Sequence, residues 1–88
     1  PEFISNMYNY NKKNQLLNLA REAHTAKSSV LIFGMDTTGT LLKKIQLHAE
    51  AGNKDKLPTL VEQVENDFND AKTKLKEILI NYNDNSDF

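Results

Sequence analysis

The side chains best suited to chemistry are the imidazole of His24 and the ammonium of Lys27, three residues later. Residues three apart on a helix lie on the same face, one turn from each other. An imidazole with one unprotonated ring nitrogen is a nucleophile near neutral pH and can attack an electrophile such as a phosphoryl group. A neighbouring ammonium lowers the cost of bringing further negative charge to that surface. The pair is therefore a candidate site for chemistry on an anionic group.

A helix that ends before Gly34 is predicted to position this pair. Its apolar residues recur at alternating spacings of three and four, which predicts one stripe facing a core: Leu16, Leu19, Ala23, Ala26, Val30 and Phe33. At about 100° per residue, His24 falls off this stripe and is expected to point outward. The residues that share its strip are Leu17, Ala20, Lys27, Ser28 and Leu31.

Three further segments have helical periodicity. One begins near Asp36, which is expected to cap it, has Leu41, Leu42, Ile45 and Ala49 on its apolar side, and stops at Gly52. The longest, bent or broken near Pro58, repeats apolar residues at fours and threes: Leu57, Val61, Val64, Phe68, Ala71, Leu75, Ile78 and Tyr82. A short one contains Phe3, Ile4, Met7 and Tyr10. The pattern predicts an all-α, up-and-down antiparallel four-helix bundle with a short or truncated N-terminal helix.

Size and composition narrow the classes of protein. A chain of 88 residues is expected to form a single domain, in which residues 1–3 look like a cloning remnant and residues 83–88 a frayed tail. A net charge of −1 gives no basic field for nucleic acid, and no apolar run approaches the length of a membrane span. Cysteine is absent, which leaves a reducing cytoplasm as the expected location.

The segment AHTAKSSVLIFG, from Ala23 to Gly34, resembles the signature of histidine-containing phosphotransfer domains, AHxLKGSS followed several residues later by Gly. The similarity continues through GMDTTGTLLKKIQLHAEAGN, which looks like the second conserved helix of that family and the turn after it. The resemblance spans roughly Leu16 to Tyr82, and in the second half it is only a pattern of apolar positions.

This resemblance implies a phosphorelay intermediate, a phosphocarrier rather than an enzyme that turns over a substrate. His24 would accept a phosphoryl group from a receiver-domain aspartate and pass it to another receiver. Lys27 would stabilise the charge, and Gln46, at the place of a family glutamine, would orient the imidazole by a hydrogen bond. The expected docking surface for response-regulator receivers consists of Leu17, Ala20, Ser28, Leu31 and Lys43.

The resemblance also implies that the domain needs no metal or cofactor, because Mg²⁺ is expected only on the partner receiver. No direct membrane contact is expected, although such domains also occur in hybrid sensor kinases, which can be membrane-bound. The sequence departs from the family pattern at Ala26, where the signature has Leu, and at Ser28, where it has Gly. Either Phe33 or the neighbouring helix is expected to fill the volume lost at Ala26.

Alternatives follow from these departures. Ser28 and Ala26 allow a degenerate module that binds receivers or another protein without phosphotransfer. A kinase dimerisation region is disfavoured, because no acidic residue follows His24 and no glycine-rich nucleotide loop is present. His48, without a partner pattern, is interpreted as a structural histidine. The short N-terminal helix leaves a groove uncovered, which predicts either self-association or a truncated chain.

Overall fold

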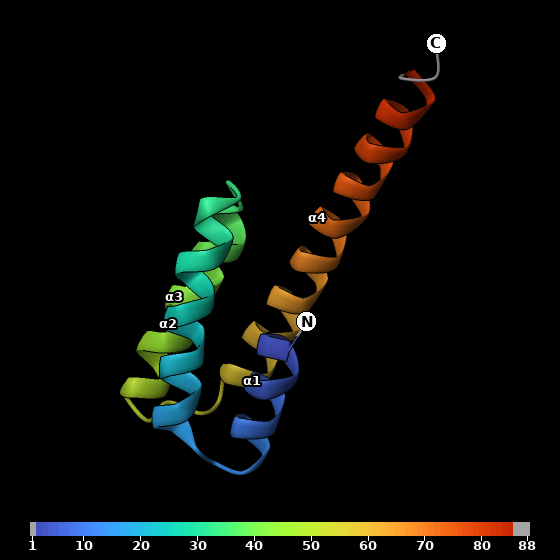
Figure 1. Ribbon diagram of the computed structural model, residues 1–88. Coiled ribbons are helices and arrows are strands. Elements are labelled where there is room, and N and C mark those ends of the chain that lie inside the picture. Colours follow the sequence, from blue (N-terminus) through green and yellow to red (C-terminus); the bar gives the residue numbers. More distant parts are fainter. Residues whose placement is uncertain (1, 86–88) are drawn as a thin grey trace.

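Four antiparallel helices run down, up, down and up in chain order (Figure 1). The computed structural model describes residues 2–85, and within that range it describes all side chains except Leu75 and those from Ile78 onward. The helices are α1 (Glu2–Lys12), α2 (Leu16–Ile32), α3 (Asp36–Glu50) and α4 (Leu57–Asn85). α1 contacts α2 and α4, and α3 contacts α2 and α4. The predicted all-α four-helix bundle with a short first helix is confirmed.

The core lies in the half of the bundle where all four helices are present. Its largest fully buried side chains come from every helix: Met7, Leu19, Leu42, Ile45, Leu57, Val61 and Val64. α2 contributes mainly small residues, including Ala20, Ala23 and Ala26, each at most 5% exposed. Small side chains on α2 let its neighbours approach closely.

The predicted apolar stripes are mostly confirmed, with one clear error. Phe33 was expected in the core and is 79% exposed. α2 ends at Ile32, so residue 33 leaves the helical path at the tip of the helical hairpin that α2 and α3 form. Its side chain therefore no longer follows the stripe. Phe33 therefore does not fill the space beside Ala26. Leu16, Leu41 and Phe68 are only half-buried, and Leu75, Ile78 and Tyr82 lie outside the described side chains.

Helix starts differ from the predictions in detail. Asp36 was expected to cap α3, but Met35 holds that position without a side-chain hydrogen bond. Asp36 lies instead in the first turn, where its carboxylate is favourable beside the positive end of the helix dipole. Pro58 lies in the first turn of α4 and does not break it, because proline is well tolerated at that end of a helix.

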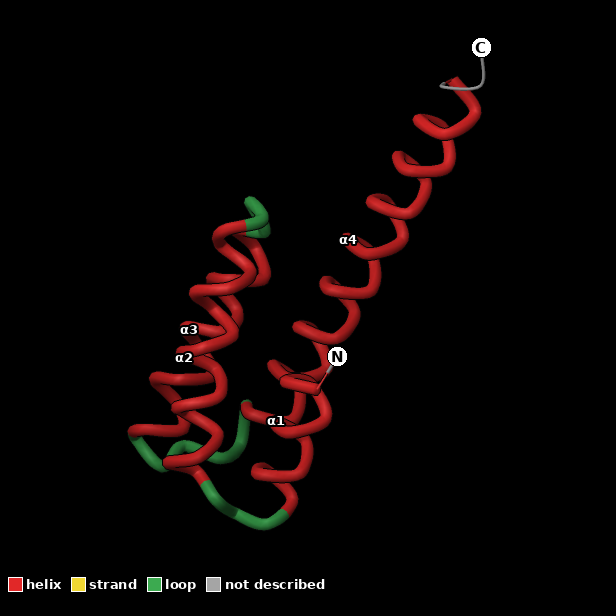
Figure 2. The backbone as a smooth tube through the Cα atoms, viewed as in Figure 1, coloured by secondary structure: helices red, strands yellow, loops and turns green. Residues whose placement is uncertain are grey.

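The turns use residues that tolerate left-handed backbone. Gly34, with φ of +74°, lies in the α2–α3 turn, where its N–H donates to the carbonyl oxygen of Leu31 at 3.0 Å. Asn14, with φ of +59°, serves the α1–α2 turn, since asparagine tolerates this region better than most residues. The loops that these turns form are visible in Figure 2.

Side-chain contacts define how α4 lies against its neighbours. The ring of Phe3 packs edge-on against Phe68, with centroids 5.4 Å apart, so Phe3, one of the residues interpreted as a cloning remnant, takes part in the fold. The hydroxyl of Thr38, which is 1% exposed, donates to the half-buried carboxylate of Asp67. Burial of a polar group without a partner is costly, so this pair favours one alignment of α3 with α4.

α4 is much longer than the helices around it. The molecule measures 56 × 20 × 16 Å, and the C-terminal half of α4 accounts for its elongation (Figure 1). α4 stays helical through Asn85, so residues 83–85, part of the tail expected to fray, are helical, and residues 86–88 lie outside the described range. Among the described helices, none combines the length and apolar character needed to cross a membrane.

Gly34→Ala should destabilise the domain by about 1 kcal/mol, because a Cβ is disfavoured in left-handed backbone. A Cβ at this position meets no atom within 4 Å, so the effect reports backbone conformation alone. Urea unfolding of the variant measures the change. Gly34→Asn should lose less stability than Gly34→Ala, because asparagine tolerates left-handed backbone better. Equal stability of Gly34→Ala and the unmodified chain would contradict the left-handed assignment.

The stability of the α1–α4 contact should depend on pH through Tyr8. Its hydroxyl donates to the Glu65 carboxylate at 2.8 Å, and desolvation, followed by this bond, raises the pKa of Tyr8 to about 12. Because an unfolded tyrosine titrates near about 10, the stabilisation is present below that pH and is lost as the pH rises towards 12. The urea midpoint should therefore fall less steeply over this interval in Tyr8→Phe. Parallel curves for the two proteins would refute the coupling.

Candidate functional site

His24 is exposed on α2 and lies beside Gln46 of α3. The distance from His24 Nδ1 to Gln46 Oε1 is 3.2 Å. Seven residues further along α2, Leu31 packs over Gly39, which lies seven residues before Gln46. The two contacts share one antiparallel register, and a Cβ on Gly39 would come within 2.6 Å of Leu31 Cδ2. Close packing at Gly39 therefore helps to bring Gln46 opposite His24.

The hydrogen bond selects a tautomer of the imidazole. A glutamine oxygen can only accept, so Nδ1 carries the hydrogen and donates to Oε1. The second ring nitrogen, Nε2, then keeps its lone pair. Because His24 is exposed, this lone pair is available to a reactant that approaches the bundle from solvent. The geometry suits an imidazole nucleophile held in one orientation.

Two lysines lie one turn from this pair, on the side of the hairpin tip. Lys27 follows His24 by three residues on α2 and is half-buried, while Lys43 precedes Gln46 by three residues on α3 and is exposed. In the antiparallel register both positions fall at the same level of the hairpin. Their ammonium groups place positive charge on one side of the imidazole, which favours an anion bound there.

A shallow groove extends from His24 in the other direction. It has a volume of about 490 Å³ and is lined by Leu17, Ala20, Arg21, His24, Thr25, Gln46 and Glu50. Leu17 is 70% exposed, so the groove has an apolar side chain at its border. Its lining residues come only from α2 and α3, which leaves the site independent of α1 and α4.

The predicted docking residues have different environments. Leu17, Ser28 and Lys43 are exposed, and Leu31, 44% exposed, lies over Gly39. Ala20 was expected on the outward strip but is 5% exposed, because its position on α2 turns towards α3, and it contributes to the groove only as a lining residue. The Ser28 hydroxyl donates to the carbonyl oxygen of His24 at 3.5 Å, a long bond that turns it towards its own backbone.

Three groove residues were not predicted. Arg21 lies three residues before His24, Thr25 follows it directly, and Glu50 lies four residues after Gln46. Arg21 and Glu50 could have been found by applying helical spacing to the histidine and the glutamine. They give the groove one cation and one anion at the end away from the lysines.

His48 lies outside this site. It is half-buried, and its Nδ1 lies 3.0 Å from the amide nitrogen of Asn53, in the segment that connects α3 to α4. This contact agrees with the interpretation of His48 as a structural histidine. Within residues 2–85, no three His, Cys, Asp or Glu side chains with described positions come together as metal ligands.

Comparison with known proteins identified no relative of this chain. The chain matches no protein-family model, no curated protein and no solved structure. The resemblance to histidine-containing phosphotransfer domains therefore depends on the motif residues and on the site described above.

Gln46→Leu should change the tautomer of His24, because the variant removes the acceptor that holds the hydrogen on Nδ1. The ¹⁵N chemical shifts of the imidazole should move towards the Nε2–H form. Gln46→Glu is the matched control, since a carboxylate keeps an acceptor at the same place. Unchanged shifts in Gln46→Leu would show that the hydrogen bond does not control the ring.

Proposed function

We propose that this domain is a phosphorelay intermediate in which His24 accepts a phosphoryl group from a receiver-domain aspartate and passes it to another receiver. The observation that carries the proposal is the contact between His24 Nδ1 and Gln46 Oε1, with Nε2 left for attack. The AHTAKSS motif around His24 supplies independent support. Two-component signal transduction is the corresponding cellular role.

The chemistry uses few groups of this chain. The Nε2 lone pair attacks phosphorus, an N–P bond forms, and the bond from phosphorus to the aspartyl oxygen breaks, so that the electron pair leaves with the carboxylate. The ring gains positive charge while Nδ1 keeps its hydrogen. The bond from Nδ1 to Gln46 then becomes charge-assisted and stronger. Transfer to a second receiver reverses these steps.

Lys27 and Lys43 stabilise the phosphoryl group electrostatically. A transferring phosphoryl group carries negative charge on its equatorial oxygens, and cations held beside it lower the barrier. The partner receiver supplies the aspartate and Mg²⁺. Leu17 and Leu31, both partly exposed on α2, are the apolar contacts proposed for receiver docking.

A second candidate is a module that binds receivers without transfer. Ser28 favours it, because this exposed residue stands one turn from His24 where the family signature has glycine. Its side chain adds volume to the surface that a receiver must approach. Measurable receiver binding together with the absence of phosphohistidine would support this candidate over the carrier.

His24→Gln should lose all acid-labile phosphate after incubation with acetyl-phosphate-charged receivers and Mg²⁺, because the nucleophile is gone. Mass measurement of the His24 peptide under mildly alkaline conditions detects the label. His48→Gln is the matched control and should retain it. Label that persists in His24→Gln would refute the proposal, provided that circular dichroism shows the same helical content.

Lys27→Ala should slow the transfer about fivefold to tenfold, since one partly solvated cation contributes roughly 1 kcal/mol. Rapid-quench measurement of phosphohistidine formation gives the rate. Lys44→Ala removes an exposed lysine next to Lys43 and serves as a control of equal charge. An equal loss in both variants would mean that only the overall charge of the domain matters.

A further inference from the structure

The C-terminal half of α4 continues past the rest of the bundle. The first turn of α1 contacts α4 at Phe68, and the α2–α3 tip faces α4 across a hollow that Ala71 and Lys74 help to line. From residue 75 to Asn85, α4 extends by eleven further residues, or about 16 Å (Figure 1). Within the described residues, no other helix runs beside this segment. A free helix of this length is marginal in water by itself.

The apolar repeat of α4 does not stop where the bundle stops. From Leu57 to Tyr82 the apolar residues alternate at spacings of four and three without interruption, which is the a/d pattern of a coiled coil. Leu57, Val61 and Val64 are fully buried in the bundle, whereas Phe68 and Ala71 are half-buried. Leu75, Ile78 and Tyr82 continue this row of a and d positions, the apolar seam of α4, in the sequence. The pattern indicates a second helix along the extension.

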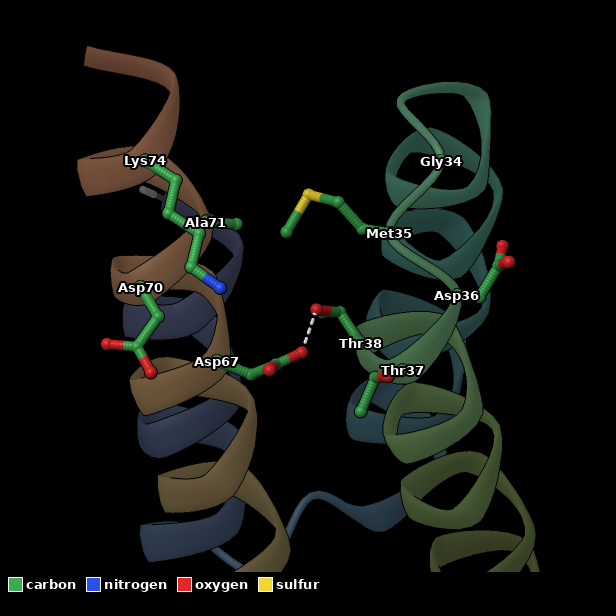
Figure 3. A pocket seen from close by; sticks show the side chains of 9 residues that line it. All are labelled: Gly34, Met35, Asp36, Thr37, Thr38, Asp67, Asp70, Ala71 and Lys74. Carbon is green, nitrogen blue, oxygen red and sulfur yellow. Dashed lines mark hydrogen bonds between the residues drawn. The ribbon is translucent and has the colours of Figure 1, made fainter. Parts of the chain in front are cut away.

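A hollow lies where this seam leaves the bundle. It has a volume of about 260 Å³ and lies between the start of α3 and α4 (Figure 3). Met35 points across it towards Ala71, while Asp67 and Lys74 provide polar groups on the α4 side (Figure 3). An apolar surface beside hydrogen-bonding groups suits an aromatic ring with a hydroxyl, as in tyrosine.

The heptad register supplies such a residue when two copies of α4 run antiparallel. If position 75 of one copy lies opposite position 78 of the other, then position 71 lies opposite position 82. Position 82 is a tyrosine and position 71 an alanine, so a large residue faces a small one at the hollow. The same register places Lys72 opposite Asn81 and Lys74 opposite Leu79, so that no like charges meet.

We propose that two copies of this chain associate through the C-terminal halves of α4, as an antiparallel pair with two-fold symmetry. The end of each α4 lies beside the α2–α3 tip of the other copy. There it continues the line of that copy's α1, whose first turn lies only at the level of Phe68 on α4. Each copy thus supplies the helix that the short α1 does not provide. Ile32 and Phe33, 81% and 79% exposed at that tip, add apolar surface beside the interface.

A parallel pair is excluded by the position of the bundle. In the N-terminal half of α4, the a and d positions are covered by the helices of its own chain, as the burial of Val61 and Val64 shows. A parallel partner would bring a second bundle into the same space. The antiparallel pair places the two bundles at opposite ends, and the groove at His24, lined only by α2 and α3, remains open. The proposal is independent of phosphotransfer.

Sedimentation equilibrium of the 88-residue chain over a range of concentrations tests the pair. Ile78→Asp should weaken dimerisation at least tenfold, because it puts a carboxylate into the apolar seam. Lys76→Asp adds the same group on an exposed face and should weaken it far less. Both variants should keep the fold of the four-helix bundle, since residues 76 and 78 lie beyond the bundle core. A chain that stays monomeric up to millimolar concentration, or equal dimerisation of the two variants, would overturn the proposal.

Spin labels give the direction of pairing. The chain contains no cysteine, so Glu62→Cys and Lys76→Cys each carry one label per copy. In the antiparallel pair the Glu62 labels are separated along the axis by about 43 Å, whereas the Lys76 labels lie near the two-fold axis. Pulsed electron resonance should therefore report a much longer distance for Glu62→Cys. Equal distances at the two positions would indicate parallel pairing and refute this interface.

Discussion

The close antiparallel packing of α2 against α3 is the constraint on which the candidate site depends. Ala20 and Ala23 on one helix and Gly39 on the other keep side-chain volume small, and Leu31 fills the space over Gly39. With helices this close, a register shift would drive Leu31 into backbone. The same register brings Gln46 opposite His24. The orientation of the imidazole is thus a consequence of packing seven residues away.

The second constraint is the unequal length of the helices. α1 has 11 residues and α4 has 29, so a complete four-helix core exists over only part of the molecule. The fully buried side chains of α4 lie in its first turns, where all four helices meet. Hydrophobic stabilisation is therefore concentrated around α1, and the continuing apolar seam is the physical reason to infer a second copy. The site at His24 and the seam lie on different parts of the surface.

Several features could be predicted because they are local. Apolar periodicity predicts all four helices, and Gly34 and Gly52 lie at the turns where the helices were expected to stop. The predictions failed where a residue leaves the helical path or depends on a neighbour. Phe33 has the spacing of a core residue but follows the end of α2, and Ala20 has the spacing of an outward residue but turns towards α3. Thr38 and Asp67 carry no sequence signal of their contact, because they come from different helices.

The sequence by itself determined which helix carries His24 and that this side chain lies off the apolar stripe, because a helix repeats every 3.6 residues whatever surrounds it. Only the tertiary structure decided that Nδ1 meets Gln46, that Lys43 shares the level of Lys27, and that Arg21 and Glu50 border the same groove. These relations depend on the register between two helices. That register follows from how side chains such as Leu31 fit against Gly39. Spacing within one helix contains no information about this fit.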